Sequence, residues 1–306
     1  MSGEERHDDL RAHLESQRAK LEATSARIEE RAGRNLFLAI GTGVLLGGVF
    51  VGSLLLNQAI FVALVAVIVA IALLELASAF RGSGRRVPRF GAMIGGVVVI
   101  AGAYWQGAQG MLLGLVLASL LLTAWRLIEG LVPRWEVPPK TLLRDIFSGL
   151  FSLVYVAFLA GFTVLLVRES GGEWWVFTLV LVVVSVDIGA YAAGITLGKH
   201  KMTPRISPNK TWEGFAGAAV AACVTATLMT TLVLGQPWWL GVIMGVLLLL
   251  SATGGDLTES LIKRNLGVKD MSSWIPGHGG FLDRLDSILP SAAVVFGVAL
   301  TAGVIA

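Results

Sequence analysis

Long apolar blocks alternate with short polar segments along the chain from Leu36 to the C-terminus. Each block is close to the roughly 20 residues that a helix needs to cross the hydrocarbon core of a bilayer. We therefore predict an all-α, polytopic integral membrane protein with about nine transmembrane helices. The expected spans cover residues 36–56, 59–80, 90–106, 110–132, 146–167, 174–194, 213–234, 238–255 and 288–306.

The same pattern divides the chain into three parts. Residues 1–33 are densely charged and predict a solvated cytoplasmic tail. Residues 34–170 hold the N-terminal transmembrane helices, and residues 171–306 hold the C-terminal ones. Within the last part, two long polar connections at 195–212 and 256–287 carry most of the chemistry-bearing side chains. We expect the catalytic region there.

The composition supports this class and excludes a water-soluble domain. Apolar residues make up 55% of the chain and charged residues 15%, with a mean hydropathy of +0.75. A soluble globular domain carries about 25% charged residues. The single cysteine, Cys223, allows no intrachain disulfide and suggests no thiolate metal site.

Lysine and arginine lie on alternate connections. All but one of the 24 fall in the tail region or in segments 81–89, 126–145, 195–212 and 256–287, and Arg168 is the exception. By the positive-inside rule these segments face the cytoplasm, which places the N-terminus there. The expected location is the inner (plasma) membrane, multi-pass, with the polar connections on the cytoplasmic side.

The first polar connection ends in Ser-Pro-Asn-Lys-Thr-Trp-Glu-Gly, residues 207–214, and leads into a membrane helix. A helix N-terminus presents unpaired N–H groups to anions, so Ser207 and Lys210 are candidates for holding a phosphate. Asn209 and Glu213 are further substrate-binding candidates. The plain structural alternative is a capped helix start with a lysine that reaches water.

The second polar connection interleaves acids and bases. On a helix continuing from the eighth span, Asp256, Ser260 and Lys263 share one face, and Asp283 and Asp286 share a face of the next helix. Carboxylate and hydroxyl oxygens suit Mg²⁺, which takes one or two carboxylates and completes its shell with water and substrate phosphates. Basic residues nearby suit a triphosphate. The other candidates in this connection are Glu259, Arg264, Lys269, Asp270 and Arg284.

Three further polar features stand out. His278 lies in a glycine loop with Gly279 and Gly280, whose backbone could approach a nucleotide closely. Asp187 lies inside the sixth span, where an ionisable group marks a site or a buried ion pair. Glu75, near the end of the second span, is expected to reach water or to pair with Arg81.

The segment from Ser260 to Asp286 resembles the signature of phosphatidate cytidylyltransferases, the CDP-diacylglycerol synthases. It reads Ser-x-x-Lys-Arg-x4-Lys-Asp-x-Ser-x-x-Ile-Pro-x-His-Gly-Gly-Phe-x-Asp-Arg-x-Asp. Residues 207–214 and the pair Asp187 and Tyr191 are similar to further elements of that family, in the same order. Ser272 stands where a glycine is common. The resemblance is close over about 180–290 and covers the earlier spans only as hydropathy.

The resemblance implies that CTP and phosphatidic acid react to give CDP-diacylglycerol and pyrophosphate, with Mg²⁺ alone or beside a second ion. It also implies an all-helical membrane fold and a homodimer, and no nucleic-acid partner is expected. By position, Asp256 and Asp283 resemble the family's metal-binding aspartates. Lys210 and Lys263 join them as the expected catalytic residues, and the phosphates of CTP and lipid are assigned to Lys210, Lys263, Arg264, Lys269 and Arg284.

Two other functions stay open from the sequence. Another CTP-dependent membrane transferase, such as a polyprenol kinase or an archaeal-type lipid cytidylyltransferase, needs the same nucleotide site with a different acceptor. A secondary transporter would use Asp187 and glycine-broken helices as binding features. The concentration of charge on one side of the bilayer disfavours the transporter.

Overall fold

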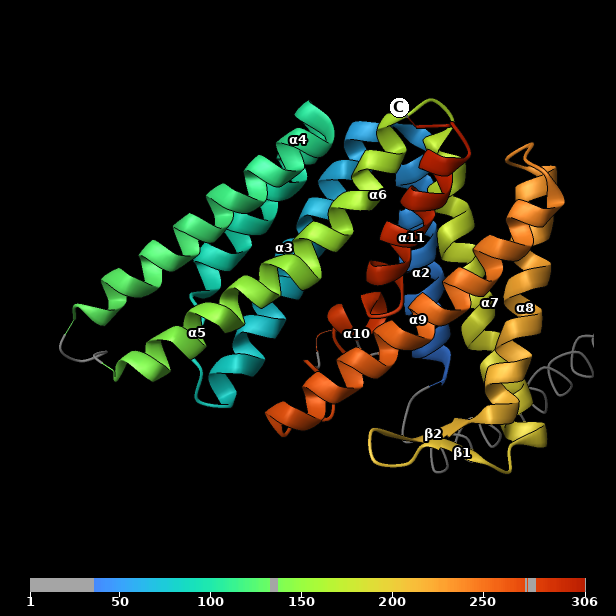
Figure 1. Cartoon of the computed structure of the whole chain (residues 1–306). Coiled ribbons are helices and arrows are strands. Elements are labelled where there is room, and N and C mark those ends of the chain that lie inside the picture. The colour runs from blue at the N-terminus through green and yellow to red at the C-terminus, as the bar shows by residue number, and fades with distance from the viewer. Residues whose placement is uncertain (1–35, 133–136, 273, 275–278, 306) are drawn as a thin grey trace, which may run out of the picture.

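The computed structural model describes residues 36–132, 137–272, 274 and 279–305, which form a bundle of helices (Figure 1). Seven helical segments within this described part are long and apolar enough to cross a bilayer. The predicted all-α membrane class is thereby confirmed, while the number of nine spans and the orientation of the N-terminus stay predictions. The helices are α2 (Leu36–Leu56), α3 (Gln58–Gly82), α4 (Arg89–Gly130), α5 (Pro139–Ser152), α6 (Leu159–Arg168), α7 (Gly172–Leu197), α8 (Trp212–Leu232), α9 (Trp238–Leu266), α10 (Leu282–Leu285) and α11 (Ile288–Thr301); a π-helical turn, η2 (Leu153–Phe158), joins α5 to α6.

Helix α4 reverses direction at Gly107, whose φ of 68° and ψ of −147° interrupt the helical backbone. Gly102 and Gly110 face each other across the reversal, because a side chain on either would meet the backbone of the other. The two antiparallel halves of α4 correspond to the spans expected at 90–106 and 110–132. Only glycine adopts such a positive φ readily, so the reversal depends on this residue.

Small residues let α7, α8 and α9 approach closely. Gly189 of α7 lies against Gly217 of α8, and Gly241 and Gly245 of α9 lie against the backbone of α8. Close backbone approach is how membrane helices gain packing energy, since lipid tails leave little hydrophobic driving force between them. The result is a tight three-helix group at one side of the bundle.

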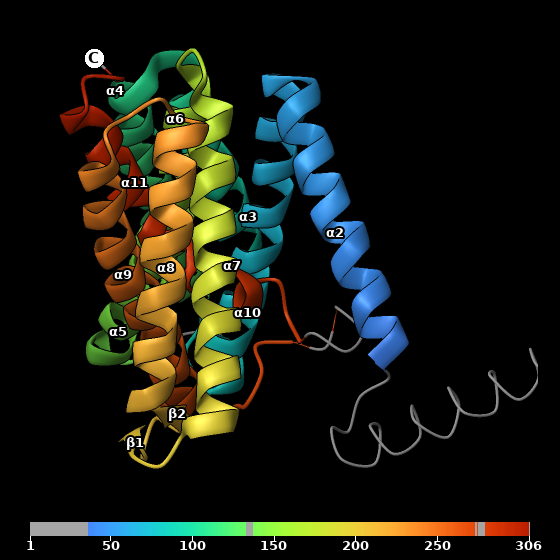
Figure 2. The ribbon, with the colours of Figure 1, turned by 90° about the vertical axis from the view of Figure 1, so that its right-hand side faces the viewer.

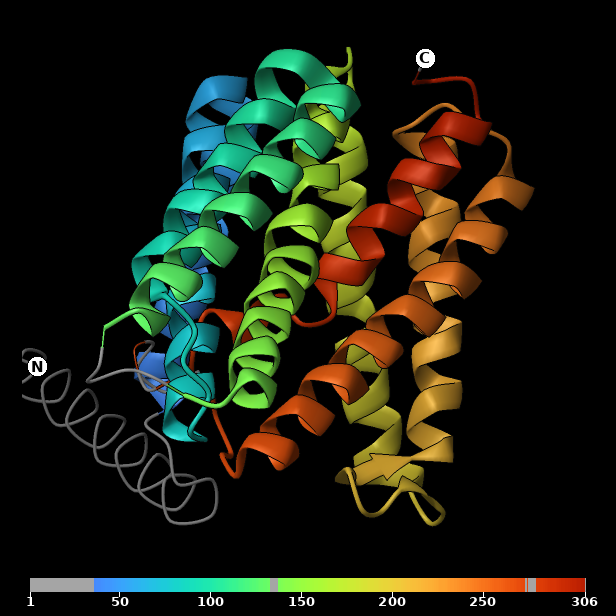
Figure 3. The ribbon, with the colours of Figure 1, turned by 60° about the vertical axis from the view of Figure 1, so that its left-hand side comes forward.

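Helices α3, α4, α5 and α6 form a second group (Figure 1). Helix α2 stands at the edge of the bundle, mainly against α3 (Figure 2). Helix α11 crosses between the two groups and packs on α6, α7 and α9, as the red ribbon in Figure 3 shows. The short helix α10 precedes α11 and lies in the lower half of the bundle in Figure 1, above the hairpin.

A small hairpin, which the sequence analysis did not predict, joins α7 to α8. Strand β1 (Lys201–Thr203) pairs antiparallel with β2 (Ser207–Thr211). The expectation that Ser207 and Lys210 lie at a helix N-terminus is therefore wrong: both are on β2. Helix α8 begins only at Trp212, and the Thr211 side chain caps it by accepting a hydrogen bond from the Gly214 amide at 3.1 Å.

Charge is segregated along the bundle. Among the described residues every lysine and arginine except Arg168 lies toward the end that carries the hairpin, the lower end in Figure 1. We call this the hairpin end. Trp174 and Trp238 begin helices at the opposite end, where indole rings favour a bilayer interface. The basic connections expected from sequence thus meet on one side of the molecule.

Candidate active site

Two adjoining cavities open at the hairpin end and share a wall made of Asp187, Tyr191 and Asp256. The first, of about 300 Å³, lies between α7, α8, α9 and the hairpin. The second, of about 530 Å³, lies between α7, α9 and the α10 region. Because the same three side chains border both spaces, molecules in the two cavities would meet at Asp187 and Asp256.

The first cavity brings together residues from both polar connections. Ser207, Asn209 and Lys210 of β2 line it beside Asp187 and Asp256. The Lys210 ammonium lies 2.5 Å from the Asp256 carboxylate, and both side chains remain partly exposed. A lysine and an aspartate from distant segments therefore meet in the cavity, with room for an anion to compete for the lysine.

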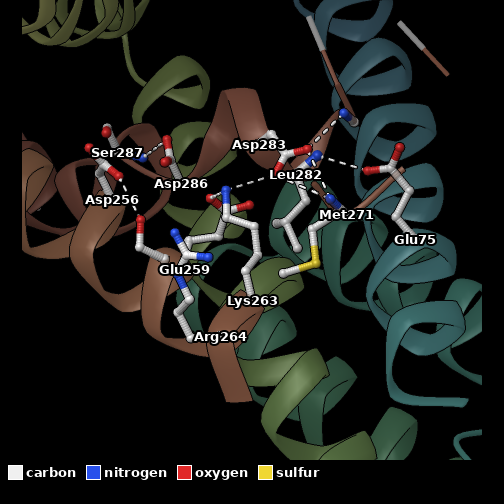
Figure 4. A network of polar contacts seen from close by, with 12 residues as sticks. Glu75, Asp256, Glu259, Lys263, Arg264, Met271, Leu282, Asp283, Asp286 and Ser287 are labelled. Carbon is white, nitrogen blue, oxygen red and sulfur yellow. Dashed lines mark hydrogen bonds and ion pairs between the residues drawn. The ribbon is translucent and has the colours of Figure 1, made fainter. Parts of the chain in front are cut away.

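Helix α9 supplies the centre of the site because it continues well beyond the expected end of its span. Ser260 donates a hydrogen bond to Asp256 at 3.3 Å, as their spacing predicted. One turn later Lys263 lies 2.6 Å from Glu259 and 3.0 Å from Asp283 (Figure 4). Glu259 is fully buried, so Lys263 neutralises a carboxylate that would otherwise be costly within the bundle.

Asp283 is held by its own loop as well as by Lys263. Its carboxylate accepts hydrogen bonds from the backbone amides of Gly280 at 2.8 Å and Met271 at 3.1 Å. Gly279, at a φ of 79°, passes so close that a side chain there would come within 2.9 Å of the same carboxylate. The glycines that were expected to approach a nucleotide here approach a protein carboxylate.

The second cavity gathers the remaining acids. Asp270, Asp283 and Asp286 line it with Arg284, in addition to the shared Asp187 and Asp256. In Figure 4 the carboxylates of Asp256 and Asp286 lie near each other, with Lys263 between them and Asp283. Asp286 accepts a hydrogen bond from the Ser287 amide at 2.6 Å. Acidic and basic groups are thus mixed along the lining of this cavity.

Several predicted residues lie outside the two cavities. Glu213 accepts hydrogen bonds from the amides of Lys199 and His200 and lies 2.6 Å from the His200 ring, so it braces the start of the hairpin. The Arg264 side chain reaches the Ile206 carbonyl at 3.5 Å and links α9 to the hairpin turn. Lys269 is exposed. The prediction for His278 falls outside the described residues.

The contacts of Glu75 were not predicted from the sequence. This residue of α3 is 2% exposed and turns into the protein. It accepts hydrogen bonds from the Ser272 hydroxyl at 2.5 Å and from the amides of Phe281 at 3.1 Å and Leu282 at 2.9 Å. Arg81, its expected partner, donates to the Val87 carbonyl instead. The only sequence signal was the presence of a carboxylate in an apolar span.

The carboxylates suit a magnesium ion that is shared with substrate. Within the described part of the chain, no group of three or more His, Cys, Asp or Glu side chains is placed to hold a metal ion by itself. Magnesium usually binds one or two carboxylates and takes its other ligands from water and phosphates. Asp256 fits this best, because it is partly exposed and lines both cavities.

Comparisons with known proteins agree with the geometry. The model of the cytidylyltransferase family matches residues 38–301. A phosphatidate cytidylyltransferase of Mycobacterium bovis is 39% identical over 272 residues, which cover 87% of this chain and 89% of the relative. One from Mycobacterium leprae is 38% identical over 280 residues, covering 89% and 90%. One from Brucella suis is 37% identical over 196 residues, covering 63% and 70%.

Proposed function

The chain belongs to the cytidylyltransferase family, and from this premise we propose that it joins CTP to phosphatidate, giving CDP-diacylglycerol and pyrophosphate. The observation that carries the proposal is the wall of Asp187, Tyr191 and Asp256 that two cavities share at the hairpin end. A transferase must bring two phosphate-bearing molecules to one point, and this wall is such a point. A transporter would need no second substrate there.

The reaction requires little proton transfer. The second pKa of a phosphomonoester is ~6, so the phosphatidate oxygen is already largely deprotonated at neutral pH. This oxygen attacks the α-phosphorus of CTP and forms the new P–O bond, while the bond from the α-phosphorus to the β-phosphate oxygen breaks and pyrophosphate leaves. The protein therefore acts by positioning and by stabilising charge, without a general base.

Basic side chains around the cavities provide that stabilisation. Lys210 and Lys263 reach the spaces from β2 and α9, and Arg284 lines the second cavity. Each lysine is held by an aspartate, Lys210 by Asp256 and Lys263 by Asp283. We propose that the incoming phosphates take over part of this pairing. The lysines are thus kept in place before substrate arrives, which lowers the cost of ordering them.

Mg²⁺ is part of the proposal, with Asp256 and Asp283 as its predicted ligands. When bound, the ion supplies positive charge that offsets the charge developing on the reacting phosphates. Asp286 lies beside Asp256 on the same cavity and adds a further oxygen donor. A second ion is compatible with this number of carboxylates.

The distribution of charge supports the proposed orientation in the membrane. Because the described lysines and arginines other than Arg168 lie toward the hairpin end, the positive-inside rule supports a cytoplasmic position for that end. The site would then face the compartment that supplies CTP. We propose an inner (plasma) membrane location, with the N-terminus also in the cytoplasm, and a homodimer as in the family that the sequence resembles.

The acceptor lipid is tested with purified protein, labelled CTP and a panel of lipid phosphates and alcohols. Phosphatidate should give labelled CDP-diacylglycerol, and polyprenol should give no labelled product. Product from polyprenol with none from phosphatidate would contradict the assignment. Uptake of a substrate into proteoliposomes without consumption of CTP would instead favour the transporter.

A further inference from the structure

Glu75 makes hydrogen bonds to the segment beside Asp283, although it has no part of its own in the proposed reaction. It lies on α3 in the N-terminal group of helices, whereas its partners Ser272, Phe281 and Leu282 belong to the segment that carries the acids of the second cavity. Figure 4 shows Glu75 pointing from α3 toward Leu282 and the neighbouring Asp283. A buried carboxylate is costly unless it is hydrogen-bonded, and here the segment provides the bonds.

The two oxygens of Glu75 hold both ends of one segment. Ser272 approaches from the side that follows α9, and the amides of Phe281 and Leu282 approach from the side that leads into α10. Gly280 passes so close that a side chain would come within 2.8 Å of a Glu75 oxygen. The missing side chain at Gly280 is what allows this contact.

The next residue after Leu282 is Asp283, so the position of the segment decides where that carboxylate lies. Asp283 takes its amide partners from Met271, which precedes Ser272, and from Gly280, which precedes Phe281. We propose that Glu75 is a positioning residue of the active site, which holds Ser272 and the backbone of Phe281 and Leu282 so that Asp283 keeps its place in the cavity. The inference rests on the proposed cytidylyl transfer.

The test replaces Glu75 by glutamine, which keeps the shape but turns one acceptor into a donor that faces a backbone N–H. Displacing a catalytic group by about 1 Å can cost about 100-fold in rate, so we expect kcat to fall by about that factor with KM for CTP and phosphatidate nearly unchanged. Rates are normalised to folded protein in the membrane. Glu75→Asp keeps the charge and should recover part of the loss, whereas Glu129→Gln, in a helix away from the segment, should behave as wild type.

A second measurement keeps the proposal testable if Glu75→Gln fails to fold. Ser272→Ala removes one hydrogen bond and should lower kcat by about 10-fold, since the bond is made to a charged group. Added to Glu75→Gln, it should cause little further loss, because both changes act on one contact. A wild-type kcat in Glu75→Gln would overturn the proposal. If the Glu75→Gln protein does not fold into the membrane, a wild-type kcat in Ser272→Ala would overturn it instead. An inactive wild type would instead refute the proposed function.

A third cavity, of about 450 Å³, lies apart from the two cavities of the candidate active site. It lies between the end of α3, the first turns of α5 and the end of α9, on the face of α9 that bears Ile262 and Asn265 and not on the face of Asp256 and Lys263. Its lining combines basic and aromatic side chains. Arg85 and Arg144 lie beside Phe80, Phe147 and Phe151.

Both arginines of this cavity lie beside protein acceptors, and Arg144 also lies 3.8 Å from the buried Asp145 carboxylate. The Arg85 guanidinium stacks over the Phe80 ring at 5.5 Å and donates to Ser148 at 3.4 Å. Arg144 donates to the Gly84 carbonyl at 3.0 Å and its side chain is 48% exposed. Deeper along α5, the Phe147 ring is exposed on the outer surface of the bundle.

We infer that this cavity binds the headgroup of an anionic phospholipid of the surrounding bilayer. Guanidinium groups form paired hydrogen bonds with phosphate oxygens, and basic pockets between membrane helices hold anionic headgroups. The phenyl rings of Phe147 and Phe151 would lie along the acyl chains. A soluble nucleotide would gain little from these outward-facing rings.

The probe is phosphatidylglycerol, a phosphodiester that cannot attack CTP, compared with phosphatidylcholine. Native mass spectrometry of protein released from mixed nanodiscs should show retained phosphatidylglycerol in excess over phosphatidylcholine. In the double variant Arg85→Gln with Arg144→Gln, the preference for phosphatidylglycerol should fall by about 10-fold, because each hydrogen-bonded pair of guanidinium and lipid phosphate strengthens binding. Arg86→Gln, next in the chain but outside the cavity, should keep it. Equal retention of the two lipids by wild type, or an unchanged preference in the double variant, would contradict the inference.

Discussion

Among single residues, Asp256 is the one on which the proposed reaction depends most. It lines both cavities, pairs with Lys210 and accepts a hydrogen bond from Ser260. The helical spacing predicted the contact with Ser260. It could not predict Lys210, because that contact depends on how the hairpin folds back over α9. Contacts between residues one helical turn apart can be predicted from the sequence, whereas contacts between distant segments cannot.

Asp256→Asn should abolish most turnover without unfolding the protein. The side chain is 32% exposed, so the amide is tolerated sterically, while the charge that binds Lys210 and the predicted metal is lost. We expect kcat to fall at least about 100-fold, as for the loss of one strong electrostatic group. Thermal unfolding in detergent should change little. Near-normal activity would refute a role for Asp256 in metal or phosphate binding.

Asp283→Asn should behave differently, because this carboxylate also supports its loop. Its side chain is only 7% exposed and accepts bonds from Lys263, Gly280 and Met271. We expect loss of activity together with a loss of stability of about 1–3 kcal/mol, the cost of leaving buried groups unpaired. The comparison of melting temperatures for the two asparagine variants measures this. Equal stability would show that Asp283 does not hold the loop.

Glu75 shows why part of the site was missed at this scale. Its hydrogen bond to Ser272 joins residues 197 positions apart. The apolar context of the second span indicated only that the carboxylate needed a partner. Choosing among Arg81, water and a distant loop required the packing of α3 against α10.

At the scale of elements, hydropathy predicted most helices closely. Helix α2 has the expected bounds, and α7 and α8 begin within two residues of theirs. The hairpin was missed because strands of three and five residues with polar side chains leave no alternating apolar pattern. Yet this hairpin brings Lys210 to the first cavity. The short element with the weakest pattern is thus part of the site.

Two neighbouring glycines of α9 give a matched test of how the elements position the acids. A side chain at Gly255 would collide with the Asp286 backbone and with Pro290, whereas one at Gly254 would meet nothing within 4 Å. Gly255→Ala should therefore separate α9 from the start of α11 and lower activity by at least about 10-fold, since small displacements are costly in a preorganised site. Gly254→Ala should stay close to wild type. Equal activity of the two would contradict the packing of α9 against the Asp286 backbone and α11.

In the whole molecule, the basic connections that alternate along the sequence lie together at the hairpin end. The tail lies outside the described residues, and its role was not predicted. The polar connections from both halves of the chain meet at the hairpin end, although Glu75, Lys210 and Asp283 belong to three distant segments. The distribution of lysine and arginine along the sequence could place these segments on one side of the membrane. It could not predict which residues of the different segments contact one another.

Orientation is tested by labelling cysteines introduced in a Cys223→Ser background. Arg205→Cys, in the hairpin turn, should be labelled by a membrane-impermeant reagent only after cells are opened. Gln236→Cys, between α8 and α9, should be labelled in intact cells. The reverse pattern would place the site outside the cytoplasm.

Deletion of residues 1–30 should leave catalysis within about twofold of the full chain, because none of the proposed site residues lies there. The assay compares specific activity per folded protein. A large loss would show that the tail takes part in the reaction.

Transfer of a cytidylyl group can be followed by the fate of two labels in CTP. Purified protein in phosphatidate-containing vesicles receives CTP labelled at either the α- or the γ-phosphate, with Asp256→Asn as the inactive control. We expect the α-label to enter the lipid and the γ-label to be released as pyrophosphate. Entry of the γ-label into lipid, as a kinase would give, or no labelled lipid from an intact wild-type protein, would contradict cytidylyl transfer.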